Sequence, residues 1–250
     1  MEANWRKRIQ IGLAVLLVAA GIRVAWVFYI RSQPAQSPKQ QRETYSANED
    51  DYVVPHKIFP YNVKSAKKEL VGKTVWVSAG NLLSYYPYAS GRAAFNRKSG
   101  VLPPLEKLEI RDVILQRAPV SLKPGQIAIV RHQIMAVFHK ADDPGNATYA
   151  VDVGSATGDD YRFTVNEEFF LDDPHQLYKH WPKDVWDSIS RHEVKVGMNE
   201  LQVGFALGTS ASVDSGSYGN RTIEYTNAGK PVTVTFSNNR AVQIAPGRAQ

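Results

Sequence analysis

The apolar and polar positions of this 250-residue chain follow three patterns in succession. Residues 9–30 are almost continuously apolar, and between Lys73 and Phe170 apolar residues tend to alternate with polar ones. After Asp173, short stretches with helix-capping residues give way to further alternating runs. Alternation with a period of two is typical of strands with one buried face, whereas caps mark helix ends. The pattern predicts an apolar N-terminal helix, a β-rich region and then an α+β region.

The first apolar stretch, residues 9–30, predicts a transmembrane helix. At about 1.5 Å per residue it is long enough to cross a hydrocarbon core of about 30 Å. Arg23 would cost about 2.5 to 3.5 kcal/mol at the bilayer centre. The Ile, Leu, Val and Phe residues of the stretch offset this cost with roughly 4 to 7 kcal/mol in total. Trp26 and Tyr29 suit the aromatic belt at the outer interface.

The charges on either side of this stretch predict its orientation. Three cations, Arg6, Lys7 and Arg8, precede it, and Arg31 follows it. Positive charge accumulates on the cytoplasmic side, so we expect a single-pass inner-membrane protein of a bacterial cell envelope, with a periplasmic body. The alternative is an export signal cleaved after Ala20. Cleavage there would leave an exposed apolar N-terminus, which favours the anchor.

The changes of composition along the chain predict five regions. These are a cytoplasmic tail (1–8), a transmembrane anchor (9–30), a flexible tether (31–51), a β-rich domain (52–172) and an α+β module (173–250). The tether is polar, contains Pro and Gln, and lacks periodicity. In the β-rich domain, Gly, Pro, Asn and Asp separate the alternating runs, which indicates antiparallel strands joined by turns. We expect a small barrel or sandwich of about five or six strands, with an SH3-like barrel as one arrangement.

Capping residues predict the helices of the α+β module. Asp173 is placed to cap one short helix, and Pro182 begins another. Asn199 and Gln202 form a capping box for a third helix, which ends at Gly208. Three strand-like runs close the chain, beginning at Arg221, Pro231 and Arg240. The fold class expected for this module is helices packed on a short antiparallel sheet.

The last quarter of the chain carries a family resemblance, through its helix followed by a strand meander. The residues concerned are Gly197, Met198, Asn199, Gln202, Val203, Leu207, Gly208, Tyr225, Val234, Phe236, Asn239 and Val242. In this order they resemble the SmpA/OmlA type of small outer-membrane-assembly lipoprotein, and more broadly the β-lactamase-inhibitor-protein-like fold. The resemblance implies two helices on a short sheet and an accessory role in outer-membrane protein assembly. The chain departs from the family at Thr209 and Ser210, where a proline is usual, and it lacks the lipid-bearing cysteine.

Composition and spacing exclude several kinds of chemistry. The chain has no cysteine, which removes disulfides, thiolate nucleophiles and Zn–Cys sites. Its net charge of +6 is scattered and forms no basic stripe, so we expect no nucleic-acid partner. The pairs His175/His180 and His132/His139 lack the spacing of a metal site. We therefore predict no catalytic residues, no cofactor and no metal.

One aromatic cluster suggests a binding loop. Tyr85, Tyr86 and Tyr88 stand close to Pro87 and Arg92, and exposed tyrosines beside an arginine could stack on a sugar or on a partner protein. The leading hypothesis is a non-enzymatic envelope protein with a protein-interaction or assembly role and an envelope protein as partner. The alternative is a peptidoglycan-binding protein that uses these tyrosines.

Overall fold

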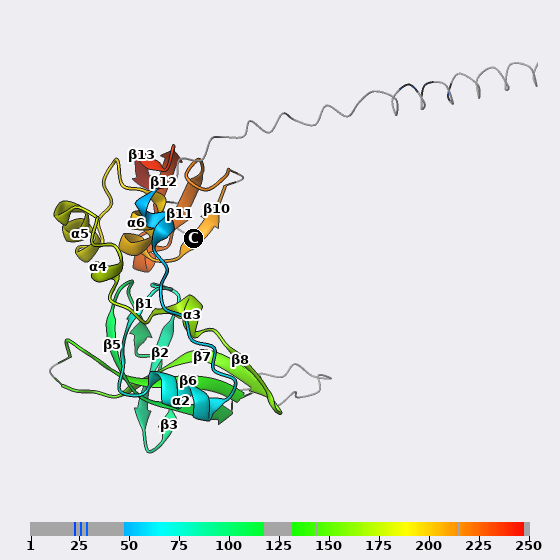
Figure 1. Cartoon of the computed structure of the whole chain (residues 1–250), viewed down its shortest axis with the longest axis vertical. Helices are drawn as coiled ribbons and strands as arrows, with labels where there is room; N and C mark the ends of the chain where they lie inside the picture. The colour runs from blue at the N-terminus through cyan, green and yellow to red at the C-terminus, as the bar shows by residue number, and fades with distance from the viewer. Residues whose placement is uncertain are drawn as a thin grey trace, which may run out of the picture. The chain divides into compact units, whose positions relative to one another are not determined.

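The computed structural model describes most of the chain after residue 47. The described residues are 48–117, 132–143, 145–214 and 216–247, together with Arg23, Trp26 and Tyr29. The chain divides into two compact units, Met1–Ala47 and Asn48–Gln250. In the first unit the three described residues are helical and exposed. The second unit has a β-rich α+β fold with two antiparallel sheets, most of whose strands are labelled in Figure 1.

The prediction of a transmembrane helix was wrong for the part of the chain that the structure describes. No helix there is both long enough and apolar enough to cross a membrane. The longest helices with described bounds have eight residues each, whereas a membrane-spanning helix needs about 20. Residues 9–30 lie outside the described part except for Arg23, Trp26 and Tyr29, and so do Arg6, Lys7 and Arg8. The single-pass inner-membrane location with a periplasmic body rested on that helix and is not supported.

The first sheet has nine strands in the described residues. They are β1 (Thr74–Val77), β2 (Ser84–Ala89), β3 (Arg92–Ala93), β4 (Gly100–Val101), β5 (Lys107–Arg117), β6 (His132–Lys140), β7 (Tyr149–Thr157), β8 (Asp160–Phe163) and β9 (Phe169–Phe170). The main path is β3-β2-β7-β6-β5-β1-β9, with β4 paired to β2 and β8 to β7. The expected five or six strands were too few, because β3, β4 and β9 have two residues each and show no alternation.

Helix α2 (Val63–Leu70) packs on this sheet and helps to close its core. Asn62 caps the helix, since its side chain accepts a hydrogen bond from the Ser65 backbone N–H at 2.8 Å. Ala66 and Leu70 lie on the buried face of α2 and join a core with residues such as Val113. A helix with one apolar face is stabilised mainly by this packing.

The short helix α3 (Val165–Glu168) places a buried carboxyl group at the start of β9. Thr164 Oγ1 donates a hydrogen bond to Glu168 Oε1 at 2.7 Å, while Oε2 is buried without a partner in the described residues. Burial raises the pKa of the Glu168 carboxyl to about 8, and the charges of Asp152 and Glu167 add to the rise. Glu168 is therefore largely protonated at neutral pH.

The second part of the unit consists of three helices and a four-stranded sheet. Its elements are α4 (Pro174–Leu177), α5 (Lys183–Ser190), α6 (Glu200–Leu207), β10 (Ser210–Val213), β11 (Thr222–Tyr225), η2 (Asn227–Gly229), β12 (Val232–Ser237) and β13 (Arg240–Pro246). The strand order is β10-β11-β12-β13, and the helices lie beside this sheet (Figure 1). The caps predicted at Asp173 and Asn199 and the helix end at Gly208 are confirmed. Both ends of α6 are thereby fixed by local chemistry.

The core of this part lies between α6 and one face of the sheet. Val203, Ala206 and Leu207 are all buried. They share a core with Val234 and Phe236 of β12. In β11 and β12 the strand residues on the other face are polar, as alternation along a strand with one covered face requires.

The segment that opens the second unit docks on these helices. Residues Glu49–Tyr52 form a short 3-10 helix, η1, although composition assigns residues up to 51 to a tether. The Asp50 carboxylate accepts hydrogen bonds from His180 Nε2 at 2.6 Å, Trp181 Nε1 at 2.6 Å and Asn199 Nδ2 at 2.7 Å. The Asp50 side chain is only 10% exposed. It is therefore a buried acceptor shared by separate segments of the chain.

The next residues connect η1 to the region of α3. The backbone N–H of His56 donates to Asp172 Oδ2 at 2.8 Å. Ile58 exchanges two hydrogen bonds with the Asn166 side chain, at 3.0 and 2.7 Å, and is itself buried in the core of the first sheet. We call residues 48–58 the strap, because they bond both to the helices before the second sheet and to the first sheet's core.

We predict that Asp50→Ala destabilises the protein by about 2 to 4 kcal/mol, because it leaves the buried donors of Trp181 and Asn199, and the more exposed His180 ring, without an acceptor. The free energy of unfolding in urea measures this change. Glu49→Ala is the matched control, since Glu49 is exposed in the same turn and should change stability by less than about 0.5 kcal/mol. Equal effects of the two substitutions would contradict the role given to Asp50.

We predict that stability falls as the pH rises from about 5 to about 8, and that Glu168→Gln removes much of this fall. The folded pKa of Glu168, about 8, lies above its ordinary value of 4.5, so the native state binds more protons in this range. Its contribution is present at low pH and is lost through about pH 8. Melting temperatures across this range measure the effect. Glu167→Gln, at an exposed neighbour, should reduce the pH dependence only slightly, because the Glu167 charge is the smallest of the causes that raise the pKa of Glu168.

Candidate functional site

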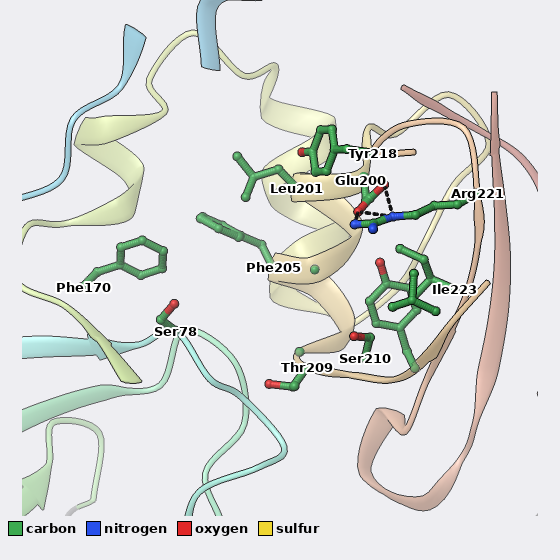
Figure 2. Close-up of a pocket in the computed structure, with 14 residues that line it drawn as sticks. Ser78, Phe170, Glu200, Leu201, Phe205, Thr209, Ser210, Tyr218, Arg221 and Ile223 are labelled. Atoms are coloured by element: carbon green, nitrogen blue, oxygen red, sulfur yellow. Dashed lines mark hydrogen bonds and ion pairs between the residues drawn. The ribbon is translucent and has the colours of Figure 1, made fainter. Parts of the chain in front are cut away.

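A groove of about 340 Å³ runs beside α6 and is the candidate functional site (Figure 2). The helix contributes residues at spacings of one, three and four, which place them on one side of α6. The apolar wall residues are Phe170, Leu201, Phe205, Val213 and Ile223. We call this cavity the α6 groove. Its lining comes from β9, α6, β10 and β11, so elements of both sheets contribute to it.

Gly204 forms part of the groove wall with bare helix backbone. Apart from its chain neighbours and the backbone of α6, a Cβ atom built on Gly204 would meet no atom within 4 Å. A glycine inside a helix is less stable than alanine by about 1 kcal/mol. No close neighbour requires the absence of a side chain at this position. The glycine therefore leaves open space in the groove, because the side chain of any larger residue would project into it.

Gly208, at the end of α6, has the opposite role. It adopts φ 81°, and a Cβ there would lie 2.4 Å from the backbone oxygen of Gly80. This close approach lets Thr209 donate its backbone N–H to Gly80 O at 2.9 Å, and Asn81 Nδ2 donate to Leu207 O at 2.7 Å. The segment after β1 is thereby fixed to the end of α6, beside Ser78 of the groove wall.

One end of the groove carries a partly buried ion pair. The Glu200 carboxylate accepts hydrogen bonds from the Gly219 backbone N–H at 2.9 Å and from Arg221 Nε and Nη2. The Glu200 side chain is 6% exposed and that of Arg221 is 25% exposed. Figure 2 shows this pair, with Tyr218 close by; the Tyr218 ring lies 5.6 Å from the guanidinium. The charge that reaches the surface at this end is therefore the cation.

The ionisable groups Arg221 and Tyr225 keep fixed charge states beside the groove. Hydrogen bonding to Glu200 raises the pKa of Arg221, so the guanidinium stays charged. Burial raises the pKa of the Tyr225 phenol, which keeps it neutral. Ser78, Thr209 and Ser210 supply hydroxyl groups to the lining. The arrangement suits binding of an apolar group next to a fixed positive charge.

Nothing matches this chain among protein-family models, curated proteins or solved structures. The resemblance of the last quarter of the chain to the SmpA/OmlA type therefore stays a prediction.

The tyrosines predicted to form a binding loop lie on a strand. Tyr85, Tyr86 and Tyr88 belong to β2 and are half-buried, and the exposed Arg92 begins β3. The Tyr85 ring packs in the core of the first sheet, with its centroid 6.1 Å from that of Phe138.

The other two tyrosines point to the opposite face of the first sheet. Tyr86 and Tyr88 lie there next to Phe95, and the centroids of the Tyr86 and Phe95 rings are 5.3 Å apart. The structure therefore separates Tyr85 from its two neighbours, as alternation along a strand requires.

The histidines have separate environments. His175 stacks on Trp186, with ring centroids 4.1 Å apart, and His180 bonds to Asp50. His139 Nε2 lies 3.0 Å from Thr148 Oγ1. Within the described residues, no group of three or more His, Cys, Asp or Glu side chains could hold a metal ion. The prediction that the protein has no metal site concerns the whole chain and stays a prediction.

The sequence did not point to the groove residues. Glu200 appears there only as an acidic residue in the first turn of a capped helix, which is common because it offsets the helix dipole. Arg221 appears only as the first residue of a predicted strand. The signal that could have been used is Gly204, since a glycine in the middle of a capped apolar helix indicates a close approach or an open space.

We predict opposite effects of alanine at the two glycines of α6. Gly204→Ala should stabilise the protein by about 0.5 to 1 kcal/mol, because alanine favours the helix and its methyl group meets no neighbour. Gly208→Ala should destabilise it by more than about 1 kcal/mol, because the residue has positive φ and the methyl group would strike the Gly80 carbonyl. Urea denaturation of both variants measures the difference. Destabilisation by Gly204→Ala would show that this position is not open.

Proposed function

We propose that this protein is a non-enzymatic binding protein, and that the α6 groove holds an apolar side chain of a protein partner. The observation that carries the proposal is the open apolar wall of the groove, with the helix backbone bare at Gly204. Apolar surface gains free energy when it leaves water, so an open apolar groove favours an apolar occupant.

The size of the groove supports a side chain rather than a large ligand. Its volume of about 340 Å³ lies at the lower end of the range of small-molecule sites, about 300 to 1,000 Å³. Burying one Leu or Phe side chain contributes about 1.5 to 3 kcal/mol. A single side chain is too weak to give specific binding by itself, so further contacts around the groove have to add to the affinity.

Peptidoglycan binding through the tyrosines remains the alternative proposal. Its support is the aromatic surface of Tyr86, Tyr88 and Phe95 on one face of the first sheet. Sugar stacking needs an exposed aromatic face, and these rings are half-buried against one another. The α6 groove is favoured because its apolar wall is open.

We predict that Gly204→Phe fills the groove and abolishes partner binding. The experiment places a photo-crosslinking amino acid at Ser210, at the edge of the groove, and follows crosslinked products of the full chain in cells that produce it. Products that depend on the groove should be lost in Gly204→Phe and retained in Gly204→Ala, which adds only a methyl group.

Two results would count against this function. Identical crosslinked products in both variants would show that the groove does not hold the partner. Sedimentation with purified peptidoglycan that is lost in a Tyr86→Ala/Tyr88→Ala variant, but kept in Gly204→Phe, would favour the glycan alternative.

A further inference from the structure

β10 is an open edge strand next to the α6 groove. Within the described residues it pairs only with β11, and all four of its residues are exposed. The opposite edge strand, β13, begins with Arg240 and ends with Pro246, and charge and proline at an edge both discourage pairing with another chain. β10, with the sequence Ser-Ala-Ser-Val, has neither. It therefore leaves backbone groups available for a further strand.

The register of β10 on β11 identifies those backbone groups. Val213 lies opposite Ile223, and the next residue, Asp214, donates its backbone N–H to Thr222 O at 2.9 Å. In an antiparallel pair, hydrogen-bonded and non-hydrogen-bonded residue pairs alternate. Val213 is thus a non-hydrogen-bonded position, and its N–H and C=O are directed to the open edge. Its side chain lines the α6 groove.

We propose that an extended peptide segment of the partner adds to β10 as a further strand, with an apolar side chain in the α6 groove and a carboxylate at Arg221. This inference rests on the proposed function and specifies its partner. One side chain in the groove gives too little affinity by itself. Strand addition supplies further affinity through main-chain hydrogen bonds, while the groove selects the side chain.

Charge complementarity identifies the carboxylate. Of the pair Glu200 and Arg221, the acid is 6% exposed and the cation is 25% exposed. A partner that reaches this end of the groove therefore meets a guanidinium whose counter-ion lies beneath it. A guanidinium has five N–H donors, and since Arg221 uses Nε and Nη2 for Glu200, the partner carboxylate would bind at Nη1. The preferred peptide has an acidic group next to its apolar residue.

The length of β10 favours a peptide over a second copy of this chain. Four residues of strand span about 13 Å at about 3.3 Å per residue. A stable dimer of folded chains buries at least about 1,200 Å² in total. A short strand beside one groove falls well below that area, whereas it matches a peptide of a few residues.

The test starts from peptides selected on the full chain from a display library of random twelve-residue sequences. Selected peptides are synthesised with free and with amidated C-termini, and their affinities are measured by fluorescence anisotropy. We expect an apolar residue adjacent to an acidic group. Loss of binding on amidation assigns that group to the chain terminus, and unchanged binding assigns it to Asp or Glu.

Val213→Pro tests the strand addition, because it removes the outward N–H without touching the ladder to β11. Val213→Ala is the matched control, since it also loses the valine side chain but keeps the N–H. We expect Val213→Pro to bind at least about tenfold more weakly than Val213→Ala. Circular dichroism and melting temperature establish that both variants fold. Peptides N-methylated at single positions test the same hydrogen bonds in the wild-type protein.

The outcomes separate this inference from the proposed function. Peptides that fail on Gly204→Phe, but bind Val213→Pro and Val213→Ala equally and tolerate every N-methylation, would overturn the strand addition and leave the groove function standing. Peptides unaffected by Gly204→Phe, or no enrichment at all, would overturn both. A dimer in sedimentation equilibrium that Val213→Pro disrupts would identify a second copy as the occupant and overturn the peptide.

Discussion

The carboxylate of Asp50 is the contact on which the arrangement of the helices and the groove depends. It accepts hydrogen bonds from the turn before α5, through His180 and Trp181, and from the cap of α6, through Asn199. Asn199 uses its other side-chain atom, Oδ1, to accept from the Gln202 backbone N–H at 2.8 Å. Because both ends of this amide are engaged, its orientation is fixed. The first turn of α6, which carries Glu200, is positioned by the strap.

Three carboxyl groups, those of Asp50, Glu200 and Glu168, offset the free-energy cost of leaving water in different ways. An ionised carboxylate in the interior needs donors or a counter-charge. Asp50 has donors from the chain segments that it joins, and Glu200 has Arg221 and a backbone N–H. Within the described residues, Glu168 has one donor, Thr164, and a second oxygen without a partner, and its raised pKa keeps it largely neutral instead. The first two groups connect segments of the chain, whereas the third makes stability depend on pH.

Local signals were sufficient for the helices and for β11, β12 and β13 of the second sheet, because a cap is decided by residues three or four apart and these strands alternate, whereas β10 was not predicted. Asn199 with Gln202, and Gly208 at the helix end, are examples of such caps. The contacts of Asp50 could not be predicted in this way. They join residues 130 to 149 positions apart, and the composition around Asp50 is that of a tether. The groove was missed for the same reason, since its walls come from α6, β9 and the hairpin of β10 and β11.

Gly204 and Gly208 shape the groove together, because a spacing of four places them on the same side of α6. Gly208 lets the Gly80 carbonyl approach, and so brings the segment after β1 against the end of α6. Gly204 has no side chain, and so leaves the groove beside it open. The result is an apolar hollow beside an edge strand that has no charge or proline. Such an edge is a liability in a protein that binds nothing there, since it offers pairing to any extended chain. The hollow limits that liability by selecting the side chain that the added strand carries, so the groove and the edge strand are parts of one binding surface.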